Sequence, residues 1–96
     1  MILTLKVLTT EFGERGCHHQ PVTQYYVNES TGIEYKGEFN EQFLFNDDTQ
    51  ESNTIRSLIK FFIKQNDTYI LQENVNDQNI IDNHSGNGCC HLTIDI

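Results

Sequence analysis

The side chains best suited to chemistry in this chain of 96 residues lie in two short segments. Segments 17–19 and 84–91 together hold all three cysteines and all four histidines. Thiolates and imidazoles are ligands that zinc prefers, in tetrahedral sets of four. Alternate residues of a strand point to the same side, so not every member of the two segments can share one ion. We predict as candidate zinc ligands Cys17, His19, Cys89 and His91.

The spacing of these ligands leaves other readings open. Structural zinc sites usually pair cysteines two residues apart, whereas both segments here hold contiguous ligands. The simplest alternative makes Cys90 a core residue and leaves the histidines in solvent. A disulfide between Cys89 and Cys90 would be strained. A cysteine nucleophile, Cys17 or Cys89 beside a histidine, lacks the flanking residues of known protease or transferase motifs.

Alternating apolar residues predict most of the elements that position these side chains. Within residues 33–39, Ile33, Tyr35, Gly37 and Phe39 fall on one face. The "NESTG" turn before them predicts a hairpin with the preceding apolar segment. The predicted strands cover residues 2–10, 22–27, 33–39, 68–74 and 89–96, with short candidates near 41–45 and 79–82.

One amphipathic helix is predicted over about residues 49–65. Ile55, Leu58, Ile59 and Phe62 repeat at the spacing of a helical face. Asp48 and Glu51 have the spacing of an N-terminal capping box. The expected fold is therefore α+β. It is a mostly antiparallel sheet of about 4–6 strands in one domain, 1–96, with this helix packed on one face.

The first and last predicted strands are expected to pair with each other. A terminal strand with an apolar alternating pattern is best protected inside a sheet. Antiparallel pairing would place the end of the first strand beside the start of the last. That arrangement would bring the two Cys/His segments together at one sheet edge and give a zinc-stabilised domain, which is the alternative functional hypothesis.

The charge balance indicates the class of partner. The chain has 14 acidic and 6 basic residues, a net charge of −8. This balance disfavours direct binding to nucleic acid or to anionic membranes and favours a basic protein partner. The C-terminal third from Gln65 onward holds five acids and no Lys or Arg. The predicted partner-binding residues are Glu38, Glu41, Asp47, Asp48, Glu51, Tyr25 and Tyr26.

The main functional hypothesis is a non-enzymatic inhibitor without a cofactor. The chain is similar in size and charge, though in no motif, to phage anti-defence inhibitors, including anti-CRISPR proteins. It is similar in the same way to immunity proteins that neutralise a toxin. Both classes imply a basic partner that handles nucleic acid, such as a nuclease or CRISPR effector. An odd number of cysteines and no signal peptide pattern predict a reducing, cytoplasmic location.

Overall fold

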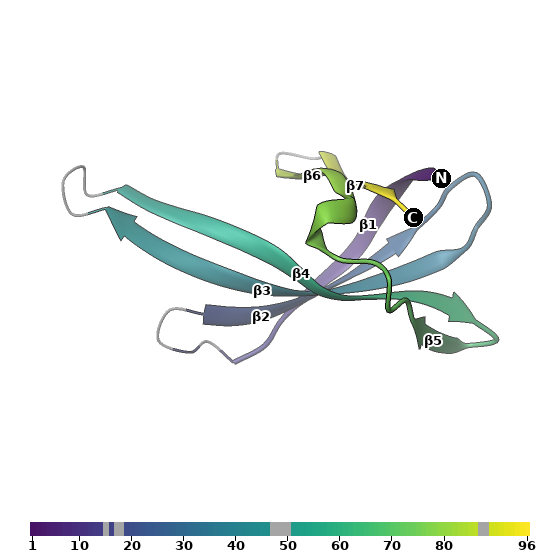
Figure 1. Ribbon diagram of the computed structural model, residues 1–96, viewed down its shortest axis with the longest axis horizontal. Coiled ribbons are helices and arrows are strands. Elements are labelled where there is room, and N and C mark those ends of the chain that lie inside the picture. Colours follow the sequence, from purple (N-terminus) through teal and green to yellow (C-terminus); the bar gives the residue numbers. More distant parts are fainter. Residues whose placement is uncertain (15, 17–18, 47–50, 87–88) are drawn as a thin grey trace.

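The computed structural model of the chain describes residues 1–14, 16, 19–46, 51–86 and 89–96 (Figure 1). All seven strands belong to one antiparallel sheet with the order β5-β4-β3-β2-β1-β7-β6. The elements are β1 (Ile2–Phe12), β2 (His19–Val27), β3 (Glu34–Asn46), β4 (Glu51–Gln65), β5 (Thr68–Leu71), the short 3₁₀-helix η1 (Asp77–Asn79), β6 (Ile80–Gly86) and β7 (Cys89–Asp95).

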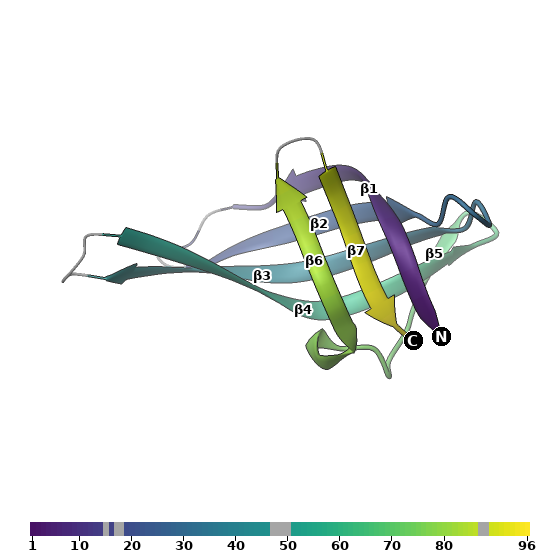
Figure 2. The same ribbon diagram turned by 90° about the horizontal axis from the view of Figure 1, so that it is seen from above.

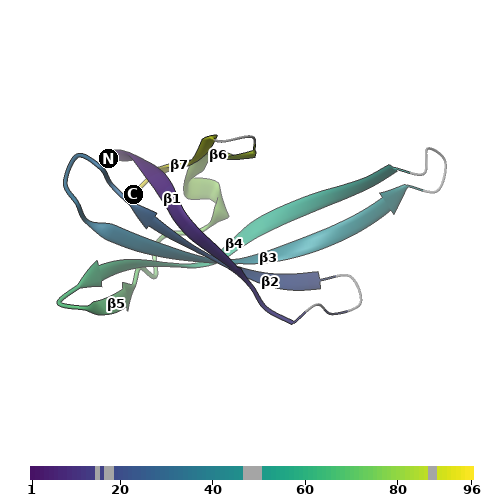
Figure 3. The ribbon, with the colours of Figure 1, turned by 180° about the vertical axis from the view of Figure 1, so that it is seen from behind.

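Strand β1 joins the two halves of the sheet. Its first part, Ile2 to Lys6, pairs with β7, and its second part, Lys6 to Phe12, pairs with β2. Val7 lies opposite Tyr26 and Thr9 lies opposite Tyr25, so Leu8 is an extra residue in a bulge of β1. Bulges bend a strand and increase its twist. The sheet therefore curls, and β6, β7 and the start of β1 lie across β2, β3 and β4 (Figures 2 and 3).

The core fills the space between these two halves. Apolar side chains from five strands meet there because each strand turns alternate residues inward. The buried members are Leu3, Leu5, Val22, Tyr26, Tyr35, Phe39, Leu58, Phe61, Leu92 and Ile94. Gly37 lies beneath the Tyr26 and Phe39 rings, and a Cβ there would come within 2.8 Å of the Phe39 ring.

The predicted helix over residues 49–65 is wrong, and so is the α+β class. Residues 51–65 form β4, and the described residues contain no α-helix. A bulge explains the misleading pattern: Phe39 lies opposite Leu58, whereas Glu38 lies opposite Lys60, so Ile59 is an extra residue. This insertion separates the inward-facing Leu58 and Phe61 by three positions instead of two. Apolar residues from both sides of the bulged strand thus fall at helical spacing: Leu58 is buried, whereas Ile55 and Ile59 are exposed. The strand count of 4–6 was also too low.

The predicted pairing of the first and last strands is confirmed. Leu3 lies opposite Ile94, and Leu5 lies opposite Leu92. All four side chains are buried, as the alternation in both segments predicted. The antiparallel character of the sheet and the hairpin around Gly32 also agree with the sequence prediction.

The hairpin of β3 and β4 extends beyond its neighbours. Strand β2 accompanies β3 only as far as the pair His19–Gln42, whereas β3 and β4 stay paired as far as Asn46 and Glu51. The two strands therefore form a projecting two-stranded arm (Figure 1). No helix in the described part of the chain is long and apolar enough to cross a membrane.

Candidate functional site

A polar cluster is built into the inner face of the sheet. Arg56 of β4 donates two hydrogen bonds, from Nε and Nη2, to the Glu41 Oε2 of β3 at 3.0 and 2.6 Å. The two residues are opposite each other across the β3–β4 ladder. Their side chains are only 20% and 9% exposed, respectively, so this is a largely buried ion pair. Such a pair fixes its two strands when all its members are satisfied.

Tyr26 extends this cluster along β2. Its hydroxyl donates to Gln24 Oε1 at 2.7 Å, and Gln24 Nε2 donates to Thr10 Oγ1 at 3.2 Å. Burial raises the pKa of Tyr26 strongly, and the nearby Arg56 charge opposes that shift only in part. The tyrosine is therefore a neutral donor whose proton is already used. The polar groups of the inner cluster hydrogen-bond to one another, so the cluster has a structural role.

An aromatic and lysine cluster occupies the opposite, outer face of the same strands. The Tyr25 and Tyr69 rings have centroids 6.0 Å apart. Lys36 Nζ lies 4.4 Å from the centroid of the Phe62 ring and 4.8 Å from that of Tyr69. Lys64 is ion-paired with Glu34 at 2.9 Å. Cation–π contacts and this ion pair occupy the lysines, so they are poorly placed to hold a phosphate backbone.

The predicted partner-binding residues divide into three groups. Tyr25 and Glu38 lie together on the outer face, where partial burial, Glu11 and Glu38 all raise the pKa of Tyr25. Tyr26 and Glu41 are buried in the inner cluster. Asp47 and Asp48 lie outside the described residues. For Glu51 the structure describes only the backbone, in β4.

Four exposed acidic side chains lie in the part of the chain that follows β4. We call Asp67, Glu73, Asp77 and Asp82 the acidic segment. All four are exposed, and no Lys or Arg occurs from Gln65 onward. Asp77 accepts a hydrogen bond from the backbone N–H of Leu58 at 3.1 Å, which fastens η1 to the bulged edge of β4. Glu73 and Asp82 make no hydrogen bond or ion pair with the described residues.

Two of the predicted zinc ligands, His19 and His91, lie on separate parts of the sheet. His19 begins β2, with its Nδ1 3.3 Å from Asn40 Nδ2. His91 lies in β7, opposite Lys6 of β1 and His84 of β6. Strand β1 pairs with β7 only as far as Lys6 and continues beside β2 as far as Phe12, so it does not bring His19 beside His91. Cys17 lies outside the described residues, and only the backbone of Cys89 is described.

Zinc binding stays a prediction for this set. The described residues include no group of three or more His, Cys, Asp and Glu side chains placed to hold a metal ion. If Cys17 and Cys89 complete a site, native mass spectrometry of protein refolded with zinc should show one bound ion. A chelator should remove the ion and lower the melting temperature, since site formation is coupled to folding. An unchanged mass and melting temperature would contradict the prediction.

The sequence analysis did not predict the outer aromatic and lysine cluster or the β4–β5 turn on which it depends. The outer cluster depends on Lys64 and Tyr69 facing each other across a two-residue hairpin turn. That turn, Asn66-Asp67, has positive φ angles of 50° and 63°. Asn and Asp at such positions are typical of tight β-hairpins, so "QNDT" between two apolar segments was the available signal.

The chain matches no family model, no curated protein and no solved structure.

Proposed function

We propose that this protein is a non-enzymatic cytoplasmic binding domain that attaches to a basic, nucleic-acid-handling protein and inhibits it. Two roles fit the proposal: an anti-defence inhibitor of a CRISPR effector or a related nuclease, and an immunity protein that neutralises a toxin nuclease. In both roles a negatively charged surface would compete with nucleic acid for a basic groove.

The observation that carries the proposal is that a larger share of the Lys and Arg residues than of the Asp and Glu residues is engaged within the domain. Arg56 and Lys64 are ion-paired within the domain, and Lys36 lies over two aromatic rings. Lys6 and Lys60 are the exposed bases among the described residues. The acidic segment, by contrast, keeps its carboxylates at the surface. The charge presented to a partner is therefore more one-sided than the composition alone implies.

Exposed apolar residues in the same part of the chain support a protein partner. Ile70, Leu71 and Ile81 are each more than 40% exposed and lie between members of the acidic segment. Interfaces between proteins combine apolar contact area with polar groups around it. Carboxylates interspersed with isoleucine and leucine fit such an interface better than they fit a site for a small ion.

A charge-reversal experiment tests the proposal. The variant Glu73→Lys/Asp82→Lys alters two exposed acids of the acidic segment. The control Glu14→Lys/Glu29→Lys alters two exposed acids elsewhere and changes the net charge equally, from −8 to −4, since each replacement adds two charges. The immobilised wild-type protein should retain basic nucleases from bacterial extract at about 0.05 M salt and release them at about 0.5 M. The segment variant should lose this retention, and the control should keep most of it.

A cleavage assay of the retained protein adds a second measurement. A retained nuclease, once purified, should lose cleavage activity when the wild-type protein is added and keep it with the segment variant. Equal retention by both variants would show that the acidic segment is not the contact. Retention of mainly acidic proteins, or retention indifferent to salt, would overturn the proposal as a whole.

A further inference from the structure

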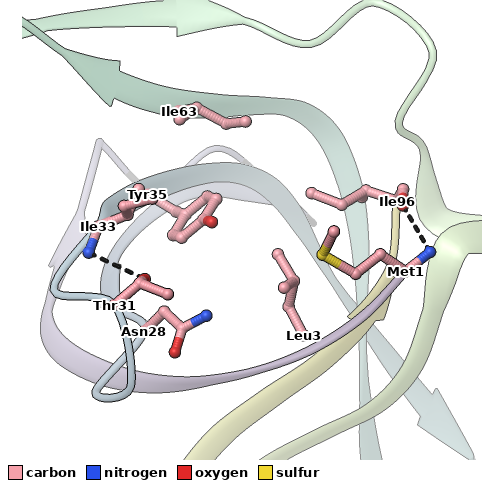
Figure 4. Close-up of a pocket in the computed structure, with 8 residues that line it drawn as sticks. All are labelled: Met1, Leu3, Asn28, Thr31, Ile33, Tyr35, Ile63 and Ile96. Atoms are coloured by element: carbon pink, nitrogen blue, oxygen red, sulfur yellow. Dashed lines mark hydrogen bonds between the residues drawn. The ribbon is translucent and has the colours of Figure 1, made fainter.

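An apolar pocket opens at the end of the core where the β2–β3 turn approaches Met1 and Ile96 (Figure 4). Its volume is about 400 Å³. The apolar lining residues are Met1, Leu3, Ile33, Tyr35, Ile63 and Ile96. Pockets of about 300–1,000 Å³ with such lining are the usual sites for small organic ligands.

Contacts within the protein hold the elements that line the pocket in place. Leu3 and Tyr35 belong to the buried core, so the inner wall is rigid. The outer wall is the turn after β2, in which Asn28 bonds to Ile33 through the backbone at 2.9 Å. Met1 and Ile96 are held together by a hydrogen bond from the Met1 nitrogen to the Ile96 carbonyl oxygen, at 2.9 Å. The cavity is therefore preformed and does not require a loop to move.

Two hydrogen-bond donors face this apolar space. The Asn28 Oδ1 accepts from the Ser30 backbone N–H at 3.0 Å, which assigns the other end of the amide as the NH₂ group. Figure 4 shows that NH₂ group and the Tyr35 hydroxyl directed into the pocket. The Tyr35 hydroxyl makes no hydrogen bond with any described residue. Burial raises the pKa of Tyr35, so its hydroxyl keeps its proton.

We propose that this pocket binds a neutral molecule with an alkyl tail and one carbonyl group. The tail would lie against Leu3, Ile33 and Ile63, and the carbonyl oxygen would accept from Tyr35 and Asn28. A neutral head fits better than a carboxylate because the chain carries a net charge of −8, and the Met1 ammonium is already paired with Asp95 at 3.0 Å. The apolar lining and the two donors thus indicate an alkyl carbonyl compound. The absence of an unpaired cation among the residues that line the pocket indicates a neutral one.

Displacement of the neutral fluorophore N-phenyl-1-naphthylamine tests this proposal. The wild-type protein should enhance its emission, and 2-decanone should displace it at concentrations at least about tenfold below those needed with decanoate. The variant Tyr35→Phe keeps the ring that stacks on Phe61 and removes only the hydroxyl. It should weaken 2-decanone binding about three- to tenfold and leave fluorophore binding unchanged, because the fluorophore has no carbonyl.

A blocking variant and a matched control locate the site. Ile33 lines the pocket mouth and is 42% exposed, so Ile33→Trp should fill the opening without disturbing the core. Ile81 is 56% exposed on β6 and does not line the pocket, so Ile81→Trp is the control. The proposal predicts loss of fluorophore binding in the first variant only. Equal binding by both variants, or tighter binding of decanoate than of 2-decanone, would overturn it. Neither result would bear on the charge-reversal test of the acidic segment.

Discussion

Replacement of Phe61 by alanine is expected to lower the free energy of unfolding by about 3–5 kcal/mol, the usual cost of removing a buried phenylalanine. The Phe61 side chain has no exposed surface, and its ring stacks on Tyr35 with centroids 5.7 Å apart. Domains of this size have a total stability of about 5–15 kcal/mol, so the loss would leave a marginal fold. Urea denaturation followed by far-ultraviolet circular dichroism measures it.

The adjacent phenylalanine provides the matched control. Phe62 is half-buried on the outer face, where Lys36 contacts its ring. Phe62→Ala should cost about 1–2 kcal/mol, from partial burial and one cation–π contact. In a helix with Ile55, Leu58, Ile59 and Phe62 on its buried face, the order of the two effects would be reversed. A larger loss for Phe62→Ala than for Phe61→Ala would therefore contradict the bulged strand.

Replacement of Arg56 by methionine is expected to cost about 2–4 kcal/mol, near the range for breaking a buried ion pair. The substitution leaves the Glu41 carboxylate, only 9% exposed, without its partner. The double variant Arg56→Met/Glu41→Leu should recover much of the loss, because the unpaired charge is gone and apolar groups fill the space. Thermal and urea unfolding of the two single variants and the double variant give the coupling free energy.

A second ion pair between the same two strands serves as the control. Lys64 and Glu34 are 32% and 37% exposed, so solvent screens their attraction. Lys64→Met should change the free energy of unfolding by at most about 1 kcal/mol. If the two methionine variants lost equal stability, or if the double variant were as unstable as Arg56→Met, burial would not be the source of the Arg56–Glu41 effect.

The sequence pattern predicted strands well where inward-facing residues keep a period of two, and it failed in β4. Leu3 and Leu5, and Leu92 and Ile94, keep a period of two, and both strands and their pairing were predicted correctly. In β4 the extra Ile59 breaks the period. A bulge is stabilised by tertiary contacts, here the hydrogen bond from the Leu58 N–H to Asp77, and such a contact has no local signature.

The candidate contact residues were only partly predictable for a related reason. Tyr25 and Tyr26 are neighbours on a strand, so one must face inward when the other faces out. Glu41 follows Tyr35, Gly37 and Phe39 in the series of β3 residues that face inward. A carboxylate can be buried at that position because the facing strand β4 supplies a cation. The cation is Arg56, which lies outside the apolar stripe of the predicted helix. One wrong element thus concealed both the ion pair and the identity of the inner face.

The position of β1 between β7 and β2 has a consequence for how the chain folds as it is made. Residues 2–6 pair with residues 91–95, so contacts that bury Leu3 and Leu5 span almost the whole sequence. Such large sequence separation slows folding because a long loop must close before the contacts form. During synthesis β2, β3 and β4 can pair in the order in which they are made. The first half of β1 can pair only after β7 has been synthesised. Until then the nascent chain exposes its core side chains, the state in which association with another chain or a chaperone competes with folding.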